Sequence, residues 1–153
     1  MKILPGSQTI LVVEDNEDHA ELIRFYLDDY VENIDIIWLR DGKEALDHII
    51  DVRQRQESSY PWLILLDLNL PKYNGHEILL RLKSSPELSE IPVVIFTTSN
   101  ASQDIQKALR RGANSYIQKP VEPELFASTL SEIVDYWTLN EHVRLINEHN
   151  HHV

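Results

Sequence analysis

The sequence predicts a single α/β domain whose core is one parallel sheet of five strands. Of its 153 residues, 42% are hydrophobic, which suffices for one domain with a substantial core and is too little for two typical domains. Short strand-like runs alternate along the chain with segments whose apolar residues recur at helical spacing. The central runs are continuously apolar, which is typical of strands covered on both faces. The predicted strands are residues 9–13, 34–39, 63–66, 93–96 and 115–118.

The first two units each join a strand to a helix through an acidic turn. The first strand ends at Glu14 and Asp15, and an apolar helical stripe begins at about Asp18. Acidic residues in this first turn suit the positive end of a helix dipole. After the second strand, residues 41–44 read Asp-Gly-Lys-Glu, which is the spacing of a capping box. Both patterns indicate helices that begin shortly after their strands end.

The third strand carries the first candidate for function. Residues 63–66 are four consecutive apolar residues that lead into Asp67, and Pro71 then ends the ladder because it has no N–H. Gly75 opens a helix that the Ser-Ser-Pro run at 84–86 stops. Asp67 at a strand end is either a turn-forming residue or a functional acid, and this residue alone does not decide between the two.

The last two units complete the alternation. The fourth strand ends in a hydroxyl at Thr97, and the helix after it is ended by Gly112. The short fifth strand ends at Lys119, and Pro123 suits the first position of a last helix. Such alternation implies right-handed crossovers with helices on both faces of the sheet.

Composition excludes several classes of function. The formal net charge is -11, which opposes binding to nucleic acid. The chain has no cysteine, so disulfides, thiolate metal sites and cysteine nucleophiles are excluded. Neither a signal-peptide pattern nor a run of transmembrane length is present, so we expect a soluble cytoplasmic protein.

The predicted topology brings polar residues from four strands together. Parallel strands have their carboxyl ends at one edge, so Glu14, Asp15, Asp67, Thr97 and Lys119 should converge there. Three carboxylates repel each other unless a cation joins them, and oxygen ligands favour Mg²⁺, with Mn²⁺ as the alternative. A metal, an ammonium and a hydroxyl facing one carboxylate would hold a phosphoryl group on it. Asp67 is therefore predicted to be a nucleophile that becomes an acyl phosphate.

These motifs, in this order and spacing, closely resemble a response-regulator receiver domain of two-component signalling. The resemblance covers about residues 9–136 and rests on the following positions: Glu14-Asp15, Asp67-Leu68-Asn69-Leu70-Pro71, Gly75, Thr97, Gly112-Ala113, Tyr116 and Lys119-Pro120. It implies a flavodoxin-like (βα)5 fold with strand order 2-1-3-4-5. It also implies that Asp67 takes a phosphoryl group from a phosphohistidine of a sensor histidine kinase. Such a protein is a phosphoacceptor that catalyses only its own phosphorylation and dephosphorylation.

The resemblance further implies a ligand set for the metal. Asp15, Asp67 and the backbone carbonyl of Asn69 would bind Mg²⁺ directly. Many receivers carry two aspartates after the first strand, whereas this chain has a glutamate at the first position. Because Glu14 is one methylene longer, we expect it to act through a coordinated water.

The same comparison assigns the phosphoryl-binding and switch residues. Thr97 and Lys119 would hold the phosphoryl oxygens, and the bond between Lys119 and Pro120 would be cis. Thr97 and Tyr116 would be the switch pair, with the hydroxyl moving toward the phosphate and the ring turning inward.

The chain continues beyond the part that resembles a receiver. Residues 1–153 are expected to be one receiver domain, with a core of about 9–136 and an extension of about 137–153 that contains no second domain. Leu139, Val143 and Ile146 repeat at four and three residues, which predicts a further amphipathic turn or helix. We expect the last helix and this extension to form a homodimer; the alternative is that the extension folds back on its own domain.

The chain also resembles the small response regulators that partner cyanobacterial phytochromes. This resemblance rests on the extension, the Glu-Asp pair and the motifs Leu-Leu-Asp-Leu-Asn-Leu-Pro and Phe-Thr-Thr-Ser. This resemblance implies a phytochrome kinase upstream and an output through protein contacts, without DNA or membrane binding.

Two other functions remain as alternatives. A phosphatase of the haloacid dehalogenase type also uses a strand-end aspartate, but it needs a second aspartate at the position of Asn69, whose amide cannot exchange protons at neutral pH. A receiver-like docking module would never be phosphorylated, yet it usually lacks one of the site residues. The cognate kinase, the target, the lifetime of the phosphorylated state, its effect on dimerisation and the role of the histidine-containing tail are left open.

Overall fold

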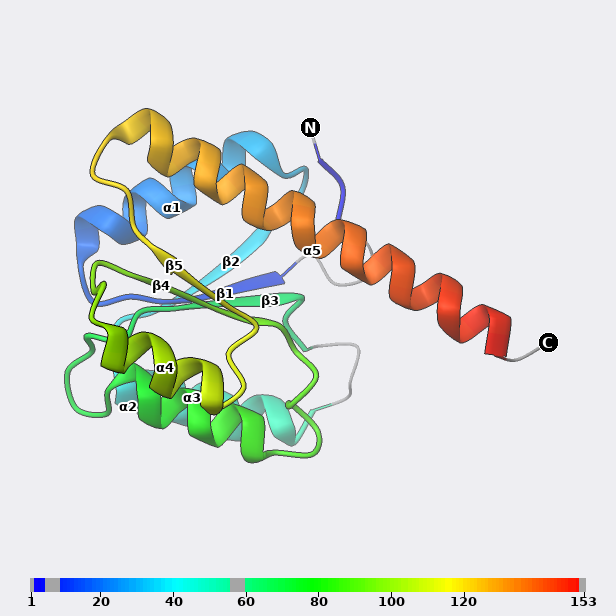
Figure 1. Cartoon of the computed structure of the whole chain (residues 1–153), viewed down its shortest axis with the longest axis horizontal. Helices are drawn as coiled ribbons and strands as arrows, with labels where there is room; N and C mark the ends of the chain where they lie inside the picture. Colours follow the sequence, from blue (N-terminus) through cyan, green and yellow to red (C-terminus); the bar gives the residue numbers. More distant parts are fainter. Residues whose placement is uncertain (1, 5–8, 56–59, 152–153) are drawn as a thin grey trace.

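The computed structural model describes residues 2–4, 9–55 and 60–151, which form a five-stranded parallel sheet between two layers of helices (Figure 1). The order β2-β1-β3-β4-β5 confirms the predicted topology. The strands are β1 (Thr9–Val13), β2 (Asp35–Leu39), β3 (Leu63–Leu66), β4 (Val93–Thr97) and β5 (Ser115–Gln118). The helices are α1 (Glu17–Tyr30), α2 (Gly42–Arg53), α3 (Gly75–Ser84), α4 (Ser102–Arg110) and α5 (Pro123–His151).

Alternate residues of the strands supply two separate cores. Helices α1 and α5 cover one face of the sheet, and α2, α3 and α4 cover the other (Figure 1). In β1, Leu11 and Val13 face the second group of helices, while Ile10 and Val12 belong to the cluster on the α1 and α5 side. All four are buried, so the unbroken apolar runs reflect burial on both faces, as the sequence predicted.

Local capping signals explain where the helices begin. Asn16, Asp41 and Asn74 precede α1, α2 and α3, and each side chain accepts a hydrogen bond from the backbone N–H three residues on. The capping box of α2 is displaced by one residue, because the Glu44 carboxylate accepts from the N–H of Arg40 rather than from that of Asp41. The predicted start of α5 at Pro123 is confirmed.

The register of the sheet determines which polar residues meet. Val13 pairs with Leu66, so the residues that follow them, Glu14 and Asp67, leave the sheet side by side. The N–H of Asp67 donates to the carbonyl of Val13 at 3.0 Å. On the other side, the N–H of Lys119 donates to the carbonyl of Thr97 at 2.7 Å. The backbone ladder therefore places the candidate side chains at one edge.

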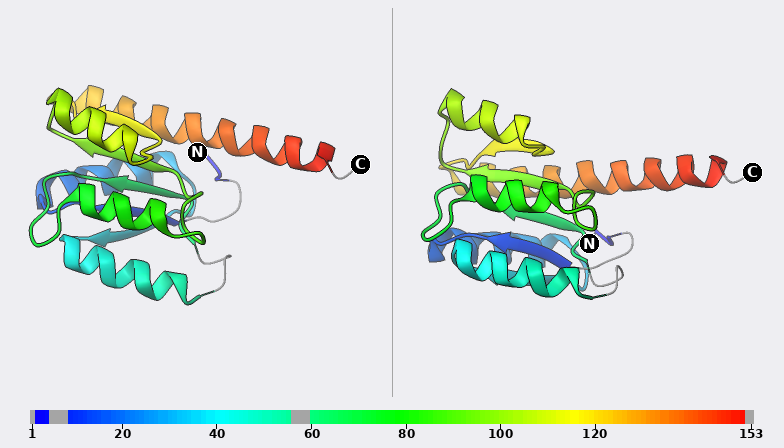
Figure 2. Two further views of the ribbon diagram at one scale, coloured as in Figure 1. Left: turned by 60° about the horizontal axis from the view of Figure 1, so that its bottom comes forward. Right: turned by 90° about the horizontal axis from the view of Figure 1, so that it is seen from below.

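The C-terminal extension is a continuation of α5 and not a separate turn. The helix runs unbroken to His151 and leaves the body of the domain (Figure 2). Near this point Asp135 accepts hydrogen bonds from the hydroxyl of Tyr30 at 2.5 Å and from Lys2 at 3.1 Å, which fastens α5 to α1 and to the N-terminal segment. Leu139 is 62% exposed, and the side chains of Val143 and Ile146, the other members of the predicted amphipathic repeat, lie outside the described ones. No helix in the described ranges combines the length and apolarity needed to cross a membrane.

Gly75 is required by the close approach of α3 to the end of β3. A Cβ at this position would lie 2.3 Å from the Asp67 carbonyl oxygen and 2.6 Å from the Leu68 Cα, and these backbone atoms cannot swing aside. We expect Gly75→Ala to lower the free energy of unfolding by about 1–3 kcal/mol because overpacking outweighs the better helix propensity of alanine. Urea unfolding tests this, with Ser102→Ala at the exposed start of α4 as the control. An alanine variant as stable as wild type would contradict it.

Candidate phosphoryl-acceptor site

Asp67 lies at the centre of the polar edge of the sheet. Its side chain is only 7% exposed and is held at both oxygens: the N–H of Asn69 donates to Oδ1 at 3.2 Å, and Lys119 Nζ donates to Oδ2 at 3.0 Å. Burial acts to raise the pKa of Asp67, but the Lys119 ammonium and the Thr97 hydroxyl outweigh it, so the pKa lies below its usual value. Asp67 is therefore an ionised, oriented and nearly buried carboxylate, which suits a nucleophile.

Glu14 is more deeply buried and has the opposite electrostatic character. It is 1% exposed and hydrogen-bonds Lys119 through Oε1. Burial raises the pKa of Glu14 to about 7, and the attraction of Lys119 only partly opposes this. Its backbone is fixed on the β2 side, where Trp38 Nε1 donates to the Glu14 carbonyl at 2.7 Å. When no metal ion is bound, Glu14 holds a proton over part of the neutral pH range.

The three acids provide a donor set that fits a hard divalent cation. Carboxylate oxygens of Glu14, Asp15 and Asp67 all lie within 4.8 Å of one another, with Asp15 exposed at the opening. Clustered carboxylates of this kind suit Mg²⁺ or Mn²⁺. Metal contact by the Asn69 carbonyl, and the water between Glu14 and the metal, stay predictions.

Thr97 and Tyr116 both contact the loop that follows β4. Thr97 is fully buried, and its Oγ1 accepts from the N–H of Ser99 at 3.4 Å. The hydroxyl of Tyr116 donates to the Ser99 carbonyl at 3.0 Å, and its half-buried ring packs against the core on the α2–α4 side. Ser99 therefore connects the two predicted switch residues, which the sequence did not indicate.

Lys119 completes the site, but the bond after it differs from expectation. The ammonium contacts the carboxylates of Glu14 and Asp67, as predicted for a cation among acids. The expected cis bond to Pro120 is wrong: among the described residues every peptide bond is trans. A trans X–Pro bond is favoured by about 0.5–1 kcal/mol, and only the family resemblance argued for the rarer isomer.

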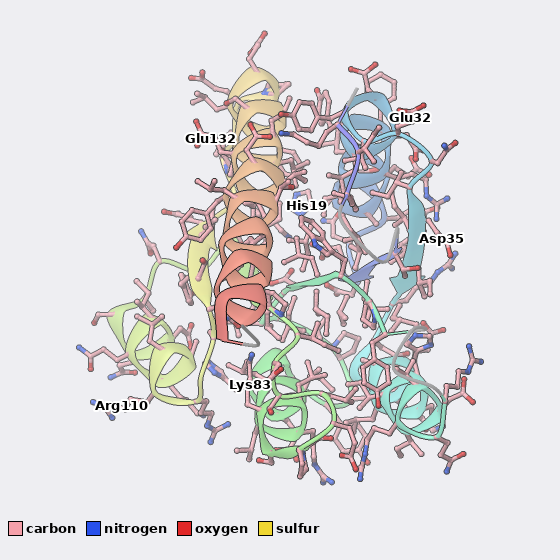
Figure 3. The ribbon with its side chains drawn as sticks, turned by 90° about the vertical axis from the view of Figure 1, so that its right-hand side faces the viewer. His19, Glu32, Asp35, Lys83, Arg110 and Glu132 are labelled. Atoms are coloured by element: carbon pink, nitrogen blue, oxygen red, sulfur yellow. The ribbon has the colours of Figure 1, made fainter. Side chains whose placement is uncertain are left out.

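His19 is a site residue that the sequence reasoning missed. The predicted site residues included no histidine, yet His19 Nδ1 is 3.0 Å from Lys119 Nζ and 3.9 Å from Glu14 Oε1. Figure 3 shows His19 between α1 and α5. One signal was available, because His19 falls in the first turn of a helix that starts two residues after Asp15.

The raised pKa of Glu14 predicts a pH-dependent stability of the metal-free protein. The folded state binds more protons than the unfolded state between the ordinary value of 4.5 and about 7. The contribution of Glu14 to the free energy of unfolding is therefore largest below pH 4.5 and is lost as the pH rises through about 7.

The variant Glu14→Gln cannot take up this proton. With a chelator present, urea unfolding across this pH range should show wild type losing stability relative to the glutamine variant as the pH rises. Histidines with a lowered pKa, such as His48, change the free energy of unfolding with pH in the opposite direction. They are present in both proteins, so their contributions largely cancel in the difference between wild type and Glu14→Gln. A difference that is flat or grows with pH would contradict the prediction.

Comparison with known proteins adds independent information. The family described as response regulator receiver domain matches residues 10–131. A probable methanogenesis regulatory protein, FilR2 of Methanothrix harundinacea, is 44% identical over 128 residues, which are 84% of this chain and 82% of that protein.

Two solved structures resemble the chain closely. The phosphorylated cyanobacterial phytochrome response regulator RcpA has a TM-score of 0.77 and 37% identity, covering 84% of this chain and 92% of that chain. The Mn²⁺-bound form of response regulator Rcp1 has a TM-score of 0.74 and 32% identity, covering 86% and 95%.

Proposed function

Because the chain belongs to the response regulator receiver family, we propose that it is a response regulator whose Asp67 accepts a phosphoryl group from a sensor histidine kinase. The observation that carries this proposal is the buried, ionised Asp67 carboxylate, held at Oδ2 by Lys119 beside two further acids. The protein signals through contacts with other proteins and acts in the cytoplasm, where a kinase has access to ATP.

The transfer is a displacement at phosphorus. An Asp67 oxygen forms the new P–O bond while the P–N bond to the kinase histidine breaks, and the imidazole nitrogen keeps the electron pair. Lys119 and Thr97 donate to the phosphoryl oxygens and so stabilise the charge that develops there. Glu14, Asp15, Asp67 and the Asn69 carbonyl would hold Mg²⁺, which neutralises phosphoryl charge when bound.

Phosphorylation would change the conformation of the loop after β4. In the proposal, the Thr97 hydroxyl moves toward the phosphoryl group, which weakens its contact with Ser99. Because Tyr116 also binds Ser99, its ring is then free to turn further inward. These changes would alter the surface around α4.

The test is mass spectrometry of the intact protein after incubation with acetyl phosphate and Mg²⁺. We expect a gain of one phosphoryl group, about 80 Da, that disappears when a chelator removes the metal. If no gain occurs, beryllofluoride is added to exclude rapid hydrolysis. Failure there as well would favour a docking module that is not phosphorylated.

The upstream kinase is proposed to be a phytochrome. The likeness to RcpA, a phytochrome response regulator, supports this assignment. Phosphotransfer from a purified phytochrome kinase, compared in red and far-red light, tests it. Transfer at rates no higher than those from an unrelated kinase would overturn it.

We also propose a homodimer formed by α5 and its extension. Tyr136 and Leu139 are 56% and 62% exposed where α5 leaves the domain, and a second copy would cover them. Sedimentation should show a dimer for the full chain and a monomer after deletion of residues 138–153. Leu139→Glu should act in the same direction, and Leu109→Glu on α4 is the control. An unchanged mass after the deletion would exclude this dimer.

A further inference from the structure

The ammonium of Lys119 needs three hydrogen-bond acceptors because its side chain is only 2% exposed. Two are the carboxylates of Glu14 and Asp67. The third is His19 Nδ1 at 3.0 Å. A buried ammonium with an unmatched N–H is costly, so the histidine completes a coordination that the acids leave unfinished.

The chain holds the His19 ring in this position from two sides. Its backbone N–H donates to the capping side chain of Asn16 at 3.1 Å, which fixes the first turn of α1. Its ring lies 6.3 Å from that of Phe126 on α5, at 42°. Packing on Phe126 alone would not require a ring nitrogen at hydrogen-bonding distance from Lys119.

The protonation of the ring agrees with an acceptor role. Lysine can only donate, so Nδ1 must be unprotonated and the ring proton is on Nε2. The contact between Nδ1 and the ammonium therefore identifies His19 as an uncharged acceptor.

An uncharged acceptor has a specific use in a site that exchanges cations. A divalent cation at the carboxylates competes with Lys119 for Glu14 and Asp67, but it does not compete for His19. The histidine can therefore keep the ammonium directed at the site when the carboxylates are taken up by the metal.

We propose that His19 is a positioning residue for Lys119, which it holds through Nδ1 so that metal and phosphoryl group can bind beside the ammonium. This inference rests on the proposed function. It adds a residue of α1 to the site, at a contact with the chain 100 residues away.

The test compares three full-length variants with the wild-type protein. His19→Leu retains an apolar side chain against Phe126 and excludes water, but offers no acceptor. His19→Asn places an amide oxygen near the position of Nδ1. His48→Leu removes a half-buried histidine of α2 and serves as the control.

Mg²⁺ alone is titrated by calorimetry, and the rate of phosphorylation by acetyl phosphate is then measured against Mg²⁺ concentration. We expect His19→Leu to bind Mg²⁺ about tenfold more weakly, as for loss of a hydrogen bond to a charged group, with His19→Asn and His48→Leu close to wild type. The Mg²⁺ concentration for half-maximal rate should rise in parallel. A leucine variant with wild-type affinity, or an asparagine variant as weak as leucine, would overturn the proposal.

The two proposals fail in different ways. If wild type gains no phosphoryl mass, the proposed function fails, while the Mg²⁺ titration still measures the role of His19. If wild type is phosphorylated and all three variants match it, only the role of His19 is wrong.

Discussion

Replacement of Asp67 by asparagine is expected to abolish phosphoryl uptake while the fold is retained. The amide keeps an oxygen that can accept from the N–H of Asn69 or from Lys119, and Lys119 remains paired with Glu14. An amide oxygen is a poor nucleophile, so no acyl phosphate can form. The intact mass after acetyl phosphate and Mg²⁺ should equal that of the untreated variant.

Two further observations make this result specific. Asp35→Asn, at the exposed start of β2, should retain the full gain of about 80 Da. The circular dichroism spectrum and the thermal unfolding transition of the Asp67→Asn variant should be those of a folded protein. A stoichiometric mass gain in this variant would mean that another acid, such as Asp15, is the acceptor, and would contradict the proposed role of Asp67.

Replacement of Lys119 by methionine is expected to cause the largest loss of stability at the site. It leaves the buried carboxyl groups of Glu14 and Asp67 without the cation between them. Breaking a buried ion pair in this way typically costs about 3–5 kcal/mol. The loss should be greatest above pH 7, because the ammonium no longer opposes the raised pKa of Glu14, whose carboxyl must then take up a proton beside ionised Asp67, and this uptake costs more as the pH rises. Added Mg²⁺ should restore part of the stability by supplying a cation.

The same variant should also lose function. Without the ammonium, the charge on the phosphoryl oxygens is less stabilised, and the rate of uptake should fall by about a hundredfold or more. Urea unfolding with a chelator at pH 8 and pH 6, followed by phosphorylation at saturating Mg²⁺, measures both effects. Lys107→Met on the exposed face of α4 is the control and should change neither. Wild-type stability in Lys119→Met would show that the carboxyl pair does not depend on this lysine.

The long helix α5 shows what local sequence patterns can and cannot predict. Pro123 marked its start. The spacing of Leu139, Val143 and Ile146 predicted a further amphipathic turn or helix in the extension; the extension is helical, and it continues α5 without a break to His151. Periodicity reports which face is apolar, and it does not report whether two helical segments share an axis.

Local features of the sequence were enough to predict the fold and the convergence of Glu14, Asp15, Asp67, Thr97 and Lys119, and the family resemblance added the order of the strands. Uninterrupted apolar runs, turn residues and polar strand ends are local features, and parallel topology converts them directly into one site. Three properties of the site become visible only in the folded chain: His19 contacts Lys119, Ser99 joins Thr97 to Tyr116, and burial raises the pKa of Glu14. These properties depend on the rotation of α1 and on packing between distant segments. The position of His19 in the first turn of α1 indicates that it is near the site, but it fixes neither the rotation nor the packing.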